Sequence, residues 1–421
     1  MTHCTRRRVS HQIAAAKQQL HRSAALPFAS LLDPDHVEQA LRQENVSFRH
    51  RIYTPLVTLC LFLSQVLDPV QCCVKAVARL LAFRAEQGLP PCSAETGAYC
   101  QARQHLPEAV LRRLTQQTGR DPLDQAENTW RWRGRNVKIV DGTTASMSDT
   151  PANQAAYPQP ANQKPGVGFP LMRLVVVFTL AVGTVLDAAM GACQGKQTGE
   201  AALWRTLLDQ IEGDDIVLAD RLFGTYFDIA LFQQRGADAV FRLHNGRRPD
   251  FRCGHKLGRF DQLVQWTKPK QRPEWMDPQT YAAMPNTLEV RLVRVRVAQK
   301  GFRTEVIDLV TTLYDAAVYS PADLAELYRL RWQAELDLRS LKVTLHMDVL
   351  RCRTPEMVRK EVWMHLLGYN LIRAVMADAA RAQGVAPREL SFAGRGRRSR
   401  YLRRCCTVVP PSDERKCING C

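Results

Sequence analysis

The spacing of apolar residues divides the chain into a helical first part and a mixed second part. Up to about Trp130, apolar residues recur at helical intervals, as at Leu56, Leu59 and Leu63, which is the period of an amphipathic helix. Near Arg135 the pattern changes to short apolar runs separated by turn-forming residues. Such runs indicate strands that alternate with helices.

The second part predicts an α/β core. The predicted elements are a strand at 136–140, a hairpin of strands at 173–180 and 184–190, a helix at 198–210, a strand at 215–219, a helix at 226–235 and a strand at 239–243. Two antiparallel strands followed by this α-β-α-β order favour a mixed sheet with helices packed on it. Helices return from Pro321 and run to about Ala380.

Between these regions the sequence predicts a basic, β-rich insertion. Residues 244–311 hold 13 Lys and Arg against 7 Asp and Glu. From residue 288 to residue 297 apolar residues alternate with Arg291, Arg294 and Arg296, which predicts a strand with a basic exposed face; an ordinary solvated strand face is the alternative. The alternation slips by one residue at Val293, and a β-bulge would explain the slip.

We therefore expect four regions. They are a helical region at 1–130, an α/β core at 131–243 and 312–385, the insertion at 244–311 and a tail at 386–421. The tail lacks periodicity and carries six arginines between Arg395 and Arg404. This composition predicts a disordered basic tail.

The net charge of the chain indicates a polyanionic partner. The formal charge is +17 and the isoelectric point is about 9.5. Lysines and arginines that neutralise phosphates release condensed counterions, which favours nucleic acid as the partner. A generic basic protein of a high-pI proteome is the alternative interpretation.

Cysteine usage and hydropathy favour a soluble cytosolic protein. The thirteen cysteines include no C-x-x-C pair, so we expect them to be reduced and mostly buried. Cys253 and His255 form at most half of a zinc site. The longest apolar runs, 55–63 and 174–186, are shorter than the roughly 18 residues that span a bilayer, and the N-terminus does not resemble a signal peptide.

Two aspartates follow predicted strands of the α/β core. Asp141 comes after Val-Lys-Ile-Val and Asp220 after Ile-Val-Leu-Ala. Sites in open α/β sheets form at the carboxyl ends of strands. An aspartate at such a position can instead be a helix cap or a turn residue.

A helix near residue 330 adds a third carboxylate. With about 100° per residue, Tyr328, Arg331, Glu335 and Lys342 fall on one narrow face of a continuous helix. The alternative is a solvated charged face with an Arg331–Glu335 salt bridge.

The spacing of these four residues resembles the Y-R-E-K signature of transposases of the insertion-sequence-four family. Other segments are similar to that family in the same order: FRHRIYTPLVTLCLFLSQVLDP at 48–69, CSAETGAYCQARQHLPE at 92–108, YPQPANQKPGVGFP at 157–170, GKQTGEAALWRTLL at 195–208, LADRLFGTYFDIALFQQRGADAVFRLH at 218–244 and RTPEMVRKEVWMHLLGYNLIRAVM at 353–376. The resemblance covers about residues 25–390 and implies a ribonuclease-H-like catalytic core with a β-rich insertion, preceded by a helical DNA-binding region.

The resemblance also implies roles for site residues. Asp141, Asp220 and Glu335 correspond to the family's catalytic and metal-binding triad, and two Mg²⁺ ions, or Mn²⁺ in their place, suit such carboxylates. Tyr328, Arg331 and Lys342 would grip DNA phosphates near the scissile bond.

An aromatic residue of the insertion would hold a flipped base in such enzymes. Trp266 and Phe302 are the candidates, and a place in the core of the insertion is the alternative for both.

The implied function is cut-and-paste DNA transposition. The partners would be the terminal inverted repeats of the element and a target DNA, with a homodimer on DNA, no membrane, and a bacterial cytoplasmic location associated with the nucleoid. The tail after Leu390 does not resemble the usual family ending. An inactivated DNA-binding remnant is therefore the alternative, and a hydrolytic nuclease on the same fold is a third possibility.

Overall fold

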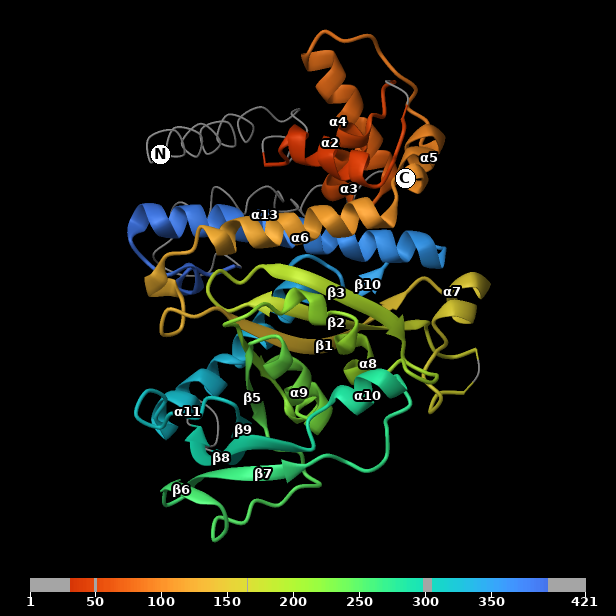
Figure 1. The fold of residues 1–421 in the computed structure, drawn as a ribbon. Coiled ribbons are helices and arrows are strands. Elements are labelled where there is room, and N and C mark those ends of the chain that lie inside the picture. The colour runs from red at the N-terminus through yellow and green to blue at the C-terminus, as the bar shows by residue number, and fades with distance from the viewer. Residues whose placement is uncertain (1–30, 49–50, 165, 298–304, 393–421) are drawn as a thin grey trace. The chain divides into compact units, whose positions relative to one another are not determined.

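The structure is a computed structural model that describes residues 31–48, 51–164, 166–297 and 305–392. The chain forms two compact units (Figure 1). One holds Met1–Gly119, Ser340–Cys352 and Glu356–Cys421, and the other holds Arg120–Arg339 and Arg353–Pro355. The first unit is mainly helical, and the second is built on a β-sheet.

Helices make up most of the first unit. They are α2 (Pro34–Gln43), α3 (Pro55–Val66), α4 (Cys73–Glu86), α5 (Gly97–His105), α6 (Glu108–Asp124) and α13 (Pro355–Gln383), with a π-helical turn at Ser340–Thr344, the short strand β10 (Val349–Leu350) and a 3₁₀ turn at Pro387–Glu389. The hydroxyl of Thr54 accepts the N–H of Val57 at 3.4 Å, and Pro55 takes the first helical position, so α3 begins here. The helical pattern predicted for the N-terminal part is confirmed over its described residues.

Helix α13 forms the core of this unit. Near its middle, a Cβ on Gly368 would meet Leu67 at 3.0 Å, so the glycine allows the residue after α3 to pack closely. The carboxylate of Glu108, at the start of α6, accepts hydrogen bonds from the Trp363 indole at 2.9 Å and from Arg359 at 2.6 and 2.8 Å. These contacts join α6 to α13.

The second unit is a mixed α/β structure, as predicted. Its strands are β1 (Val137–Met147), β2 (Leu171–Thr179), β3 (Val185–Ala192), β4 (Ile216–Ala219), β5 (Asp238–Arg242), β6 (His255–Gly258), β7 (Asp261–Thr267), β8 (Thr287–Val297) and β9 (Glu305–Thr311). Their order in the sheet is β3-β2-β1-β4-β5-β9-β8-β7-β6 (Figure 1). Strands β1, β4 and β5 are parallel, and the other pairs are antiparallel.

Helices connect and cover these strands. They are α7 (Pro151–Ala156), α8 (Glu200–Arg205), α9 (Tyr226–Gln234), α10 (Pro278–Ala283), α11 (Pro321–Leu330) and α12 (Trp332–Arg339), with 3₁₀ turns at Asn128–Trp130, Leu208–Gln210 and Arg221–Phe223. The predicted hairpin, the strands before Asp220 and at 239–243, and the helix at 226–235 are confirmed within one or two residues. The helix predicted at 198–210 is shorter, because it ends at Arg205 and only a 3₁₀ turn follows.

Strand β1 is longer than its apolar run predicted. It continues through Asp141 to Met147, because it pairs with β2 from Lys138 to Ser146. The prediction that the strand ends at Asp141 was therefore wrong. The parallel pairing with β4, in contrast, ends at Ile139.

Strand β8 carries the alternating segment without a bulge. Its pairing with β7 and β9 keeps one register throughout. The buried side chains change face along the strand, from Leu288, Val290 and Leu292 in the first half to Val293 and Val295 in the second. The predicted bulge was therefore wrong. The break in the alternation of apolar residues at Val293 arises because opposite faces of β8 are buried in its first and second halves.

Arg291 does not belong to an exposed basic face. Its side chain is 0% exposed and forms an ion pair with Asp261 at 2.5 Å. It also donates to the carbonyl oxygens of Leu313 at 3.0 Å and Tyr319 at 2.8 Å. This arginine therefore stabilises the fold, whereas the other two arginines of the strand are exposed as predicted.

The cysteines that the structure describes are free thiols. Only Cys60 among them is buried, and Cys253 is exposed, so the prediction that they are mostly buried was wrong. None of the helices in the described ranges is both long and apolar enough to cross a lipid bilayer.

Lys138, in β1, and Asp215, just before β4, form a buried ion pair. The ammonium of Lys138 lies 2.6 Å from Asp215, and the two side chains are 4% and 3% exposed. Lys138 also donates to the carbonyl oxygen of Gln210 at 2.6 Å, and Asp215 accepts the N–H of Glu212 at 2.7 Å. Removal of one partner would leave an uncompensated buried charge.

We predict that Lys138→Met lowers the free energy of unfolding by about 3–5 kcal/mol. Adding Asp215→Asn should recover at least half of the loss, because asparagine is neutral and still accepts from Glu212. The matched control is Arg294→Met, which breaks the more exposed Arg294–Asp308 pair and should cost less than about 1 kcal/mol. Urea denaturation measures all three, and an equal loss in the single and double variants would contradict the prediction.

His365 should make the stability of the helical unit depend on pH. It is fully buried in α13, and burial, with His346 nearby, lowers its pKa to about 3. Unfolding restores a pKa of about 6.5. Above pH 6.5 the imidazole is neutral in both states and does not lower the free energy of unfolding. Between pH 6.5 and 3 protonation favours the unfolded state, which lowers the free energy of unfolding by about 2 kcal/mol at pH 5.

His365→Leu should abolish that part of the pH dependence. We expect the difference in unfolding free energy between pH 7.5 and pH 5 to shrink by about 2 kcal/mol in the variant. The control is the exposed His105→Leu, which should keep the wild-type difference. An unchanged difference in His365→Leu would show that the buried imidazole is not the source.

Candidate active site

Asp141 and Asp220 follow the last paired residues of two adjacent parallel strands. The pairing of β1 with β4 ends at Ile139 and Leu218, so each aspartate lies two residues beyond the last pair. Asp220 keeps an extended backbone, with φ −78° and ψ 173°. Both aspartates are half-buried. Asp141 therefore lies just beyond the point where β1 stops pairing with β4, although β1 continues to pair with β2.

Arg331 joins Asp141 to Glu335. Its Nη2 lies 2.6 Å from Oε1 of Glu335, and its Nη1 lies 3.7 Å from Oδ2 of Asp141. The three side chains are only 19–35% exposed. A guanidinium from the turn before α12 therefore compensates one carboxylate on a strand and one on a helix.

The carboxyl group of Asp141 lies in an environment that disfavours its charge. Burial, together with the carboxylates of Glu335 and Glu200, raises its pKa to about 6. Arg331 and the N–H of Gly142, which donates to Oδ1 at 2.9 Å, act in the opposite direction. Burial and carboxylate repulsion thus outweigh the single cation.

The hydroxyl group of Tyr328 is affected by the charges of both Asp220 and Arg331. Burial raises the pKa of its hydroxyl to about 12, the charge of Asp220 raises it as well, and Arg331 and Arg242 lower it. The hydroxyl therefore stays protonated near neutral pH and can act as a hydrogen-bond donor.

The helix that carries the predicted Tyr-Arg-Glu-Lys face is not continuous. Helix α11 ends at Leu330, Arg331 forms a turn, and α12 passes into the π-helical turn that contains Lys342. The prediction of one α-helical face for all four residues was therefore wrong, because the number of residues per turn changes. Lys342 belongs to the helical unit, and the other three belong to the sheet unit. The Arg331–Glu335 salt bridge of the alternative interpretation is present, at 2.6 Å.

The sequence analysis missed two charged residues near this group. Glu200 begins α8, within the segment GKQTGEAALWRTLL. Arg242 is the last residue of β5. Both lie in segments that carried the family resemblance, but no spacing rule links them to the aspartates, because they approach through the fold.

The donor set fits a hard divalent cation in charge and in atom type. Carboxylate oxygens are the ligands that Mg²⁺ prefers, and two of the carboxylates already share one cation, Arg331. Within the described residues, no three acidic, histidine or cysteine side chains lie close enough to hold a metal ion. A divalent cation would therefore require Arg331 to release a carboxylate.

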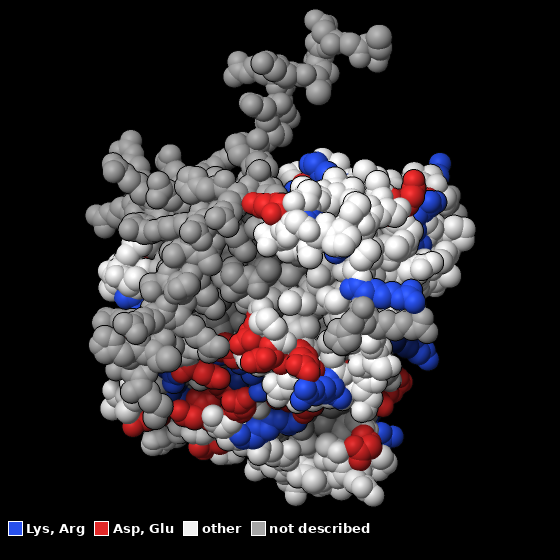
Figure 2. Space-filling model, turned by 90° about the horizontal axis from the view of Figure 1, so that it is seen from above, with Lys and Arg blue, Asp and Glu red and all other residues white. Residues whose placement is uncertain are grey.

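The aromatic candidate Trp266 and the basic residues near it in the insertion have partners within the fold. Trp266 is 8% exposed and lies under the guanidinium of Arg247, 3.9 Å from the ring centre. Phe302 lies outside the described residues. Arg252 forms a 2.9 Å ion pair with Asp250. Figure 2 shows the molecule from above, and on that face Asp and Glu side chains lie next to Lys and Arg side chains.

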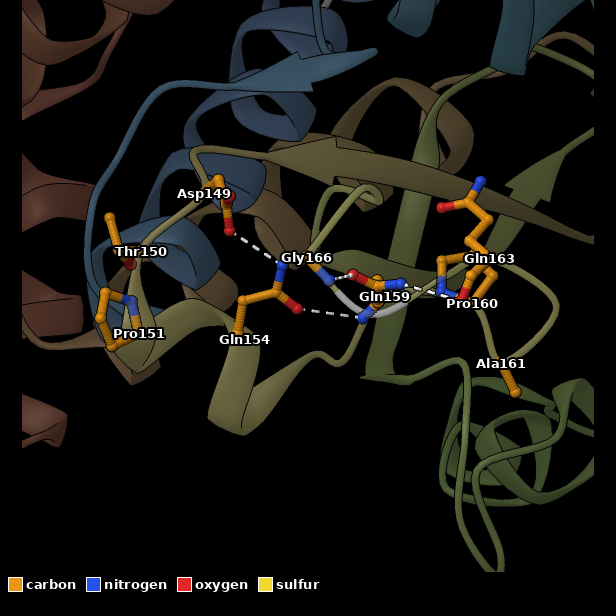
Figure 3. Close-up of a pocket in the computed structure, with 9 residues that line it drawn as sticks. All are labelled: Asp149, Thr150, Pro151, Gln154, Gln159, Pro160, Ala161, Gln163 and Gly166. Atoms are coloured by element: carbon orange, nitrogen blue, oxygen red, sulfur yellow. Dashed lines mark hydrogen bonds between the residues drawn. The ribbon is translucent and has the colours of Figure 1, made fainter.

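A cavity of about 610 Å³ lies in the loop that follows β1 (Figure 3). The amide of Gln159 organises its wall: Oε1 accepts the N–H groups of Gly166 and Gly168, and Nε2 donates to the carbonyl oxygens of Gln163 and Lys164. These polar groups hold the loop, and none of the predicted site residues lines the cavity.

Comparisons with known proteins agree with the sequence resemblance. The family described as Transposase DDE domain matches residues 132–371, a range that includes all six predicted site residues. Transposase InsG for insertion sequence element IS4, from Escherichia coli strain K12, is 28% identical over 299 residues, which cover 70% of this chain and 64% of InsG. The transposase for insertion sequence element IS421 of Escherichia coli is 44% identical over 54 residues, 13% of this chain and 15% of that protein. The chain thus spans less than two thirds of the length of InsG.

Proposed function

Because this chain belongs to the transposase DDE domain family, we propose that it is a DNA transposase that cuts at the ends of a mobile element and joins them to a target DNA. The observation that carries the proposal is the bridge of Arg331 between Asp141 and Glu335. The guanidinium of Arg331 brings Asp141, from a strand, and Glu335, from a helix, close together. Asp220 follows the adjacent strand β4. The family match across all six residues does not favour an inactivated remnant.

In this proposal the sheet unit is a ribonuclease-H-like core. The order β3-β2-β1-β4-β5, with three antiparallel strands followed by two parallel additions, supports it. Strands β6, β7 and β8 continue the same sheet through β9 and correspond to the β-rich insertion. The helical region at 1–130 would recognise the terminal inverted repeats.

Asp141, Asp220 and Glu335 would hold two Mg²⁺ ions, for which Mn²⁺ could substitute. Bound ions of this kind stabilise negative charge on a phosphate and activate water or a 3′-hydroxyl. The raised pKa of Asp141 supports this role, because carboxylates gathered in a half-buried site repel one another until a cation compensates them.

The neighbouring residues would orient the DNA. When a cation takes over the carboxylates, Arg331 becomes free to form a bidentate contact with a phosphate. The protonated hydroxyl of Tyr328 can donate to the same backbone, and Lys342 would add a point charge. The net charge of +17 supports a DNA partner. Synapsis of two ends implies a homodimer on DNA, in the bacterial compartment that holds the nucleoid.

Glu335→Gln tests the proposal directly. We expect cleavage of a duplex that carries the element end to fall at least about 100-fold, because an amide cannot replace the charge of a metal-binding carboxylate. Binding of the same duplex should be retained. The measurement is Mg²⁺-dependent cutting of labelled DNA, with EDTA as blank and the exposed Glu326→Gln as matched control. If the wild type binds the duplex but does not cut it, the chain is better explained as an inactivated remnant. If it cuts the duplex but does not join the ends to a second DNA, a nuclease is favoured.

Arg331→Met tests the exchange between the guanidinium and a metal ion. Without Arg331 the carboxylates of Asp141 and Glu335 lack their cation, so added Mg²⁺ should stabilise the variant more than the wild type. We expect the rise in melting temperature on Mg²⁺ addition to be larger by about 2–4 °C, which corresponds to about 1 kcal/mol for a unit of this size. The exposed Arg329→Met is the control. Equal shifts in all three proteins would argue against a metal site at these carboxylates.

A further inference from the structure

The segments that follow β4 and β5 meet at the end of the sheet that carries Asp220. The two strands pair in parallel up to Ala219 in β4 and Phe241 in β5, so the segments after them leave the sheet at the same edge. Arg221, the residue after Asp220, donates from Nη1 to Oδ1 of Asn245 at 2.9 Å. This hydrogen bond joins the two segments next to the predicted carboxylate.

Arg247 belongs to the second of these segments and is stacked on a tryptophan. Its guanidinium carbon lies 3.9 Å from the ring centre of Trp266. Trp266 lies in β7 and is only 8% exposed, so the fold holds its ring in place, whereas Arg247 remains accessible to solvent. Stacking occupies one flat face of the guanidinium and leaves the N–H groups around its edge available for an anion.

Neither Arg221 nor Arg247 forms an ion pair with an acidic side chain among the described residues. Partial desolvation lowers the pKa of Arg247, and no carboxylate nearby raises it. Arg252, on the same connection, is in contrast paired with Asp250 at 2.9 Å. A guanidinium that the fold holds in position but does not neutralise has its charge available for a ligand.

We propose that Arg221 and Arg247 form a phosphate clamp that holds a DNA strand beside Asp220. The proposal rests on the transposase function proposed above, and it adds two arginines to the residues expected to contact DNA. Each guanidinium can form a bidentate contact with a phosphate. Their existing contacts, with Asn245 and Trp266, order these long side chains before DNA binds, which lowers the entropic cost of binding.

The first test measures how salt affects binding of a duplex that carries the element end to the full chain, with EDTA present to prevent cutting. Arg221→Met and Arg247→Met should each weaken binding at least about tenfold. Each should also reduce the slope of log affinity against log salt by about 1, because one phosphate contact is lost.

The matched control is Arg252→Met, which removes a 90% exposed side chain that already has an acidic partner. This variant should keep the affinity and the salt slope of the wild type. Partial unfolding would reduce the fraction of protein that binds but would leave the slope unchanged, so the slope separates a phosphate contact from a structural role. Unchanged slopes in both Arg221→Met and Arg247→Met would overturn the clamp.

A double-mutant cycle tests whether Trp266 holds the guanidinium of Arg247. Arg247→Met should weaken binding at least about tenfold when Trp266 is present but less than about threefold in a Trp266→Leu background, since the two side chains act together. Trp266→Phe keeps an aromatic ring and should keep most of the affinity. Circular dichroism and melting temperature verify that both variants of this nearly buried residue fold. Equal losses in the two backgrounds would overturn the stacked geometry of the clamp.

Cleavage of the element end by the same proteins separates this inference from the proposed function. If the wild type cuts and both arginine variants bind and cut like the wild type, the clamp is overturned and the transposase function stands. If the salt slope depends on the two arginines but the wild type does not cut, the clamp stands and the proposed function fails. A wild type that does not bind the duplex overturns both.

Discussion

Negative charge gathered around one strand is the constraint on which the candidate site depends. Asp141, Glu335 and Glu200 come from three elements, and burial adds to their mutual repulsion by raising the pKa of Asp141 to about 6. A single guanidinium, that of Arg331, compensates two of them. The charge of this cation therefore fixes the positions of the Asp141 and Glu335 carboxylates relative to each other.

The sheet supplies the place where these groups meet. Strand β1 pairs with β2 over most of its length, but its pairing with β4 stops after three residues. Beyond that point one edge of β1 is no longer covered by β4, while the strand itself remains firmly held by β2. Pairing with β2 from Lys138 to Ser146 therefore gives Asp141 a rigid backbone. Side chains carried on rigid strands are positioned more precisely than side chains on loops.

The insertion contributes more to the fold than its basic composition indicated. Strands β6 to β8 extend the sheet, and the buried Arg291 ties β8 to Asp261 and to two carbonyl oxygens. Other basic residues there are also paired, as Arg294 is with Asp308.

The sequence by itself determined the element types, most of their positions and the family, because periodicity, turn residues and motif spacing are local properties. The candidates Asp141, Asp220 and Glu335, on which the proposed function is built, also come from the sequence and its family resemblance. Only the tertiary structure decided that β1 continues past Asp141, that the helix breaks at Arg331, and that Arg291 is buried. It alone placed Arg247 over the ring of Trp266. These outcomes depend on which strand pairs on each edge and which helix covers each face, and no local pattern records contacts between segments far apart in the chain.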